Sequence, residues 1–242
     1  MHQISLAVLA VAALTVASSG GSASAQVPRA CFAAGNEVST DQRIDNCTNL
    51  IESGGLPDES LAVAYQNRGT AFLRKEQYDQ AIADYDRAIA IVPGYGNAFN
   101  SRAVAYQAKG LKDRALDDFG EAIRLAPDDA NAFNGRCWLR ASIGQLQGAL
   151  EDCNESLRLR PGSSNALDSR GFIYLRQGRW SEALADCDAA LLANPRNAWA
   201  LFERGIAKLR TGDMAGGNAD IEASRMLDPK AEVELTSFGV TP

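Results

Sequence analysis

Two kinds of residue pair recur in this sequence at the same spacing of sixteen residues. Cys31 and Cys47 are sixteen residues apart, and so are Cys137 and Cys153. Five arginines are each followed sixteen residues later by an aspartate, in the pairs Arg68/Asp84, Arg102/Asp118, Arg136/Asp152, Arg170/Asp186 and Arg204/Asp220. Cysteine pairs can form disulfides, and a guanidinium can hold a carboxylate with two parallel hydrogen bonds. These residues indicate crosslinking of the fold.

Residues that commonly serve catalysis or metal binding are scarce. The single histidine is His2, in a segment that we expect to be removed on export. The sequence has no C-x-x-C pair, no P-loop and no G-x-G-x-x-G motif. Its acidic residues are best explained as solvated helix faces and ion pairs, so an enzyme would have to rely on carboxylates alone. We therefore expect no enzyme activity, no cofactor and no metal site.

The arginine and aspartate series belong to a repeat of 34 residues. The first copy is 62–95, and the others are 96–129, 130–163, 164–197 and 198–231. Position 32 of each copy is a proline, and position 15 is a glycine in all copies but the first, where Glu76 stands. Positions 8 and 20 carry small side chains. Glycine at 15 can end one helix, proline at 32 cannot continue a second one, and small residues let the two approach. Each copy is predicted to be a helix, a turn and a second helix.

With this period and these positions, the unit resembles the tetratricopeptide repeat, or TPR. The resemblance covers residues 62–231, although position 11 is Arg140 in copy three and Lys208 in copy five, in place of an aromatic residue, and Gly217 stands at position 20 of copy five. It implies an all-α fold, a right-handed solenoid in which antiparallel helix hairpins stack into a superhelix.

The cysteine spacing fits this hairpin. Positions 8 and 24 lie at the same level of two antiparallel helices, and Cys137 and Cys153 occupy them in copy three. Cys31 and Cys47 fall on the same positions of a degenerate unit, which we place at 26–61 as an N-terminal helical hairpin cap. We predict two disulfides, each worth on the order of 3 kcal/mol. Cys187 would face Gly171 and remain a lone buried thiol.

The arginine and aspartate series occupies positions 7 and 23, which are also level with one another. In the degenerate unit both charges are missing, because Ala30 and Asn46 stand there. We hypothesise structural ion pairs within a repeat or between neighbouring repeats. If the pairs are exposed, each contributes only ~0–1 kcal/mol. A phosphate-binding role for the arginines is a weaker alternative, since each has an aspartate at hand.

The two ends of the chain are predicted to differ from the repeats. Residues 1–25 have the pattern of a secretory signal peptide, with an apolar run over 4–17 and Ala23-Ser24-Ala25 as the cleavage motif. The alternative is an uncleaved anchor. No other long apolar run follows, so we expect no membrane span after cleavage. Residues 232–242 are predicted to form a C-terminal cap, in which Val233, Leu235 and Phe238 cover the last hairpin.

The resemblance implies that the first helix of each unit lines a concave groove, at positions 2, 5, 6, 9, 12 and 13. An asparagine series falls on these positions: Asn67, Asn97, Asn100, Asn131, Asn134 and Asn165. An aromatic group also does: Trp138, Phe172, Trp199 and Phe202. Asparagine could pair with peptide amides, and the aromatic residues could form anchor pockets. Alternatively, Asn97, Asn131 and Asn165 cap their helices, and Trp199 and Phe202 pack against the chain end.

We therefore predict a periplasmic or secreted scaffold or adaptor that binds a protein or an extended peptide in its groove. A structural or assembly role, through self-association or docking onto a cell-envelope complex, is the alternative. A clamp for terminal carboxylates finds no support, because the groove positions are nearly free of Lys and Arg. A nucleic-acid partner is not expected, because the formal net charge is −6 and no basic stripe occurs.

Overall fold

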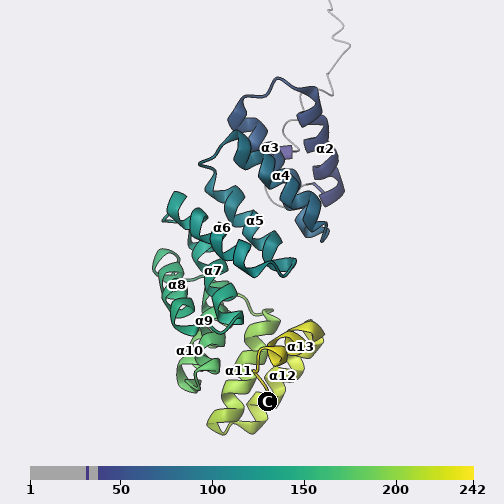
Figure 1. Ribbon diagram of the computed structural model, residues 1–242. Coiled ribbons are helices and arrows are strands. Elements are labelled where there is room, and N and C mark those ends of the chain that lie inside the picture. Colours follow the sequence, from purple (N-terminus) through teal and green to yellow (C-terminus); the bar gives the residue numbers. More distant parts are fainter. Residues whose placement is uncertain (1–30, 33–37) are drawn as a thin grey trace, which may run out of the picture.

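The structure is a computed structural model that describes residues 31–32 and 38–242; the expected signal peptide lies outside the described residues. Within the described ranges it is an all-α solenoid without strands, and its helix hairpins follow one another from α2 at one end to α13 at the other (Figure 1). The helices are α2 (Thr40–Ser53), α3 (Asp58–Arg74), α4 (Tyr78–Ile91), α5 (Gly96–Ala108), α6 (Lys112–Leu125), α7 (Ala130–Ser142), α8 (Leu146–Leu159), α9 (Ser164–Arg176), α10 (Trp180–Ala193), α11 (Ala198–Thr211), α12 (Met214–Leu227) and α13 (Pro229–Ser237).

Each 34-residue copy contains one helix pair, from α3/α4 in the first to α11/α12 in the fifth. Helix α3 differs from the other first helices, because it begins at Asp58, one turn before the start of its copy. In copies one to four the proline at position 32 lies three residues before the first helix of the next copy. Before α3 the proline is Pro57, directly at the helix start, and Asp58 and Glu59 then favour the first turn through the helix dipole.

The turn between the two helices depends on a left-handed residue at position 15. Gly110, Gly144, Gly178 and Gly212 all have positive φ, between 71° and 98°. In copy one the same conformation is imposed on Glu76, whose φ is 59° and which is the one non-glycine residue with positive φ in the described part of the chain. Copy one therefore keeps the geometry of the turn at the cost of backbone strain.

The first helices of neighbouring repeats form the inner wall of the solenoid. Helices α3, α5, α7, α9 and α11 contact one another in succession, whereas the second helices described here contact only the first helices that flank them or, at the end, α13. Rows of helices that touch lie on the shorter, concave side of a curved stack. Residues on the exposed side of the first helices therefore face the groove.

Every arginine at position 7 holds the aspartate at position 23 of its own repeat with two hydrogen bonds. For Arg102 the Nε and Nη2 atoms lie 2.7 and 2.8 Å from the two Asp118 carboxylate oxygens. The five aspartates are all buried. The pairs are therefore internal to a hairpin, and they lock its two helices at one level.

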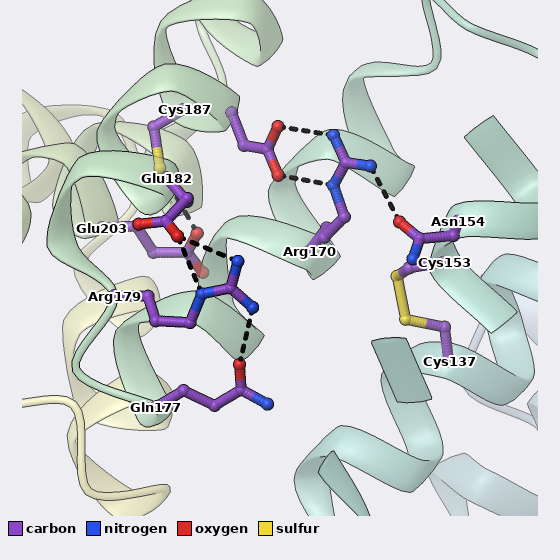
Figure 2. Close-up of polar contacts among 10 residues, drawn as sticks. Cys137, Cys153, Asn154, Arg170, Gln177, Arg179, Glu182, Cys187 and Glu203 are labelled. Atoms are coloured by element: carbon purple, nitrogen blue, oxygen red, sulfur yellow. Dashed lines mark hydrogen bonds and ion pairs between the residues drawn. A yellow bond between two sulfur atoms is a disulfide. The ribbon is translucent and has the colours of Figure 1, made fainter. Parts of the chain in front are cut away.

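The Nη1 atom of the same arginine, which does not bond the aspartate, donates a hydrogen bond to the residue at position 25 of the preceding unit. It bonds Thr48 in the N-terminal unit, Asp86, Asn154 and Asp188; Figure 2 shows the contact from Arg170 to Asn154. In copy three the acceptor is missing because Gly120 stands there. One guanidinium thus joins two helices of its own hairpin and a third helix of the previous one.

The structure gives a reason for Arg140 and Lys208, which replace the aromatic residue at position 11 of copies three and five. In copies one, two and four an aromatic ring at this position lies 5.7–5.9 Å from the guanidinium carbon of the position-7 arginine. Arg140 and Lys208 replace that ring, and each instead bonds the buried aspartate, Asp152 or Asp220, at 2.7 or 2.8 Å. These two carboxylates therefore have two cations each.

The cysteines lie as the hairpin geometry requires. Cys31 and Cys47 form one disulfide and Cys137 and Cys153 another, with Cα–Cα distances of 4.8 and 5.4 Å. Cys187 is a buried free thiol. In repeats one, two and five positions 8 and 24 pair a small residue with a large one. At Gly69, for example, an added Cβ would lie 2.7 Å from the Tyr85 ring.

The C-terminal helix α13 packs on α11 and α12 (Figure 1). Leu235 is fully buried and Val240 is 4% exposed, so this segment does cover the last hairpin. Val233, which we had placed in the same apolar face, is 69% exposed. The reason is that α13 turns its Ala231 and Leu235 face inward, and Val233 lies halfway between them on the opposite side. None of the described helices has the length and hydrophobicity that a membrane crossing requires.

Replacing Glu76 by glycine should relieve the strain of the first turn. We expect Glu76→Gly to raise the free energy of unfolding by roughly 0.5–1 kcal/mol, because glycine adopts positive φ freely. Urea denaturation followed by circular dichroism measures this. Glu76→Ala is the matched control, since it removes the carboxylate but keeps the Cβ. An equal gain from alanine would mean that charge, and not backbone strain, is responsible.

Removal of the position-7 arginine should lower the free energy of unfolding most in repeats where the aspartate has no second cation beside it. We expect Arg102→Met to lower the free energy of unfolding by about 3 kcal/mol, because it leaves the Asp118 carboxylate buried and unpaired. Arg136→Met should cost clearly less, because Arg140 still pairs with Asp152. The double variant Arg136→Met/Arg140→Met should restore the larger loss. Equal losses for the two single variants would contradict this explanation.

Candidate functional site

A pocket of about 930 Å³ opens on the inner wall of repeats two to five. Its lining comes from α5, α6, α7, α9 and α11, from the end of α12 and the loop before α11, and from α13 with the Phe238 that follows it. Four residues of the predicted groove line it, namely Asn134, Trp138, Asn165 and Trp199. The groove positions of four successive repeats are therefore brought together in one concave site, and the end of the chain supplies one of its walls.

Aromatic rings form a cluster at one side of this pocket. The Trp138 ring centroid lies 5.0 Å from that of Phe172, 5.4 Å from that of Trp199 and 5.8 Å from that of Phe238. The contacts with Trp199 and Phe238 are edge-to-face, an arrangement that the quadrupoles of the rings favour. Phe238 comes from the chain end, and the rings that it contacts are those of Trp138 and Phe172. Our alternative concerned Trp199 and Phe202; of these two, Phe202 lies in the same buried core as Leu235 and Val240 of the C-terminal segment.

Phe172 and Phe202 do not face the groove, and their assignment as groove residues is wrong. Both side chains have no solvent exposure, and both belong to the core formed by repeats three to five with α13. Phe172 is covered because Trp138 and Phe238 both pack against it. Position alone does not decide exposure here, because the folded-back C-terminal helix closes over part of the inner wall.

The asparagine series divides into several environments. Asn67 donates from Nδ2 to the backbone oxygen of Cys31, 3.0 Å away, and so fixes the N-terminal unit. Asn131 accepts a hydrogen bond from Arg160. Asn97, Asn100 and Asn165 make no side-chain hydrogen bond to any residue that the structure describes. Only the last of these three lines the pocket.

None of the asparagines at position 2 caps its helix, so this alternative is wrong. The caps stand at position 34 of the preceding copy: Asp129 for α7, Ser163 for α9 and Asn197 for α11. Each accepts from a backbone N–H of the first turn, as N-cap side chains do. Helix α5 has no side-chain cap. Asn97, Asn131 and Asn165 therefore have no part in helix capping.

Asn134 and Asp168 are the polar residues at position 5 of repeats three and four, and both line the pocket. The Oδ1 atom of Asn134 is buried and has no hydrogen-bond partner in the described part of the chain. The Asp168 carboxylate accepts one hydrogen bond, from Asn197 Nδ2 at 3.2 Å. Asn197 uses its oxygen to cap α11, so one side chain ties the helix start to the pocket.

Glu203 lies behind Asp168, between α9 and α11, and is fully buried. Its Oε2 atom accepts a long contact from the Cys187 thiol at 3.7 Å, as Figure 2 shows, whereas its Oε1 atom has no partner in the described chain. Burial raises the pKa of Asp168 to about 7, against the lowering effect of the bond from Asn197. Burial, together with the negative charge of Asp168, raises the pKa of Glu203 far above its usual range.

The burial of Glu203 follows from small neighbours. In repeat four, positions 8 and 24 are Gly171 and Cys187, and two such residues cannot fill their level of the hairpin as Gly69 and Tyr85 do. The Glu203 carboxylate takes the space: a Cβ added to Gly171 would lie 3.2 Å from its Oε2. We did not single out Asp168 and Glu203 from the sequence. The available signal was two acidic residues at groove positions 5 and 6 with no arginine at the matching spacing.

Three sequence models, each described as a tetratricopeptide repeat, match the chain over residues 62–95, 100–164 and 164–197. The matches together span four of the five predicted copies, and more than half of the chain. No curated protein gives a significant match.

Solved structures with this fold cover most of the chain. YrrB, described as a TPR protein with an unusual peptide-binding site, is 19% identical, covers 79% of this chain with 96% of its own, and gives a TM-score of 0.55. A thermophilic TPR protein of Thermus thermophilus is 18% identical over 74% of this chain and 100% of its own, with a TM-score of 0.62. A tetratricopeptide repeat protein of Parabacteroides merdae is also 18% identical, over 80% and 79%, with a TM-score of 0.62. At these identities the likeness concerns the fold alone.

The buried carboxyl of Asp168 should make the protein less stable as the pH rises. Its pKa is about 7 in the folded chain, above the ordinary value of 3.8, so its contribution to stability is full below pH 4 and is lost as the pH rises through 7. From pH 5 to pH 8 we expect this group to lower the free energy of unfolding by on the order of 2 kcal/mol. Urea denaturation at both pH values measures the change.

Asp168→Asn supplies the comparison for this pH effect, since it keeps the shape of the side chain without the titration. Between pH 5 and pH 8 we expect the free energy of unfolding of this variant to fall by about 2 kcal/mol less than that of the wild type. Asp128→Asn, at an exposed aspartate, should behave as the wild type does. A decline of the same size in Asp168→Asn would show that another group causes it.

Proposed function

We propose that this protein, which belongs to the tetratricopeptide repeat family, is a scaffold without enzyme activity that binds a protein or an extended peptide segment in the pocket of its inner wall. The observation that carries this proposal is the pocket itself, which runs along α5, α7, α9 and α11. A site that spans four parallel helices suits an elongated partner.

The side chains of the pocket support peptide binding. Asn134 and Asn165 have unused donors or acceptors there, and a carboxamide can bond the amide groups of a peptide backbone whatever its sequence. Trp138 and Trp199 offer a rigid apolar surface beside them, of the kind that anchors a partner's side chain. The peptide-binding site reported for YrrB, a protein of the same fold, agrees with this use of the solenoid.

Export is the second part of the proposal. The two disulfides need an oxidising compartment to persist, and the expected signal peptide at 1–25 would supply the route. We therefore propose a periplasmic or secreted protein. Alkylation of the secreted chain, unfolded without reduction because Cys187 is buried, should find one free thiol, and five after reduction.

A role in assembly is the alternative, and one observation favours it. Leu192 and Met226 occupy position 29 of repeats four and five and are 87% and 80% exposed. Apolar side chains at the same position of adjacent units could form a contact surface away from the pocket. The partner would then be a second copy of the chain or a cell-envelope complex.

Selection from a random-sequence peptide library displayed on phage tests the binding proposal. We expect the immobilised protein to enrich peptides. The double substitution Asn134→Ala/Asn165→Ala should weaken the binding of a synthetic copy of an enriched peptide by about thirtyfold, because each of the two lost hydrogen bonds is worth about 1 kcal/mol. Neither substitution removes an internal bond. Fluorescence anisotropy of the labelled peptide measures the dissociation constant.

Leu192→Ser is the matched control on the other surface and should leave peptide affinity unchanged. If no peptide is enriched, or if Leu192→Ser and not the double asparagine variant weakens binding, the pocket is not the site. A sedimentation coefficient that rises with protein concentration would instead support self-association, provided that Leu192→Ser abolishes this concentration dependence.

A further inference from the structure

Two acidic side chains near the pocket differ from the buried aspartates of the ion-pair series. Asp84, Asp118, Asp152, Asp186 and Asp220 each hold an arginine. In the described part of the chain, Asp168 and Glu203 form no ion pair with any lysine or arginine. Asp168, which lines the pocket, is thus an acidic group that forms no ion pair with a described residue, and Glu203 is a second one in the core behind it.

Three acceptor groups at this place receive few or no hydrogen bonds from the described residues. The Asp168 carboxylate, the Asn134 Oδ1 atom and the fully buried Glu203 Oε1 atom come from α9, α7 and α11, which are neighbouring helices. Against them stand the Asn197 Nδ2 group and the weak thiol donor of Cys187. Unpaired buried acceptors cost free energy that a ligand rich in donors would recover.

We propose that the pocket receives a basic side chain of the bound segment, an arginine or a lysine, whose nitrogen atoms bond Asp168 and Asn134. Guanidinium and ammonium groups carry several donors and no acceptor, which suits these unsatisfied acceptors. The rings of Trp138 and Trp199 border the same pocket and can hold the cation or its alkyl stem through cation–π and apolar contact. Glu203, behind Asp168, holds its proton because burial raises its pKa, so the negative charge of the site comes from Asp168. This inference rests on the proposed function, because it names the chemistry of the segment that the groove binds.

The charged groups around Asp168 set how the binding depends on pH. Glu203 faces it from α11, Cys187 from α10 and Asn197 from the loop before α11, and Asp186 of α10 acts on Glu203 and Cys187. Lys112, Arg196, Asp228 and Glu234 also line the pocket. A cation binds the ionised carboxylate, and about a tenth of Asp168 is ionised at pH 6 compared with nine-tenths at pH 8 when its pKa is about 7. Affinity should therefore rise with pH by about tenfold over this range.

The test uses peptides enriched from the same displayed library. We expect them to share an arginine or lysine at one position. Synthetic peptides with citrulline in place of that arginine, or norleucine in place of that lysine, remove the charge and keep the length. The neutral peptides should bind the wild type at least tenfold more weakly at pH 8, and their affinity should not rise between pH 6 and pH 8.

Asp168→Asn should abolish most of the difference between the charged and the neutral peptide, while Asp128→Asn, an exposed aspartate outside the pocket, should retain it. Circular dichroism and the binding of the neutral peptide verify that the variant is folded. Enriched peptides without a common basic residue, or equal affinity of the charged and neutral peptides, would overturn the inference and leave the peptide scaffold standing. So would a full charge preference in Asp168→Asn. Failure to enrich any peptide would overturn the proposed function as well.

Discussion

The bidentate contact between the arginine at position 7 and the aspartate at position 23 fixes the geometry on which the rest of the solenoid depends. It sets the level at which the two helices of a hairpin meet, and the third nitrogen of the same guanidinium fixes the hairpin against the previous one. A buried ion pair gives little net stability compared with an apolar contact, but it strongly disfavours any arrangement that leaves one charge unpaired. A slip of one helix along the other would break every such pair, so the series selects one register.

The same constraint makes the exceptions informative. A carboxylate can be buried in this fold when an arginine stands sixteen residues away, and Asp168 and Glu203 have none. Glu203 is buried because Gly171 and Cys187 leave space between α9 and α11. Asp168 is partly buried and accepts the hydrogen bond of Asn197. The fold tolerates these acids because each can hold a proton, as the raised pKa values of both groups indicate. Groups that are stable only when protonated or paired are suited to respond to a cation that arrives from outside.

Most of the hairpin architecture could be predicted from the sequence, because the residues that determine it act locally and recur. Gly110 and its equivalents end the first helix, the prolines at position 32 end the second, and residues sixteen apart meet across the turn. The local environment of the groove could not be predicted in the same way. Phe172 and Phe202 are buried because α13 folds back across the inner wall, and the start of α3 depends on Pro57, which lies outside the repeat. The asparagines at position 2 looked like helix caps, but the residue before the helix, at position 34, had already taken that role.

Because of the position of α13, the C-terminal end of the solenoid is more rigid than the N-terminal end. Phe238 contacts Trp138 and Phe172, which belong to repeats three and four, so the C-terminal segment ties repeats three to five together across the groove. In the N-terminal half, by contrast, each first helix is held by its immediate neighbours, as in an ordinary stack of repeats. Curvature is therefore fixed where the aromatic cluster and Asp168 lie, and a rigid wall lowers the free energy that would otherwise be lost in ordering the site on binding. A bound segment would find its specific contacts at this rigid end. Toward α5 and α3 it would meet a wall whose hairpins can adjust to its backbone.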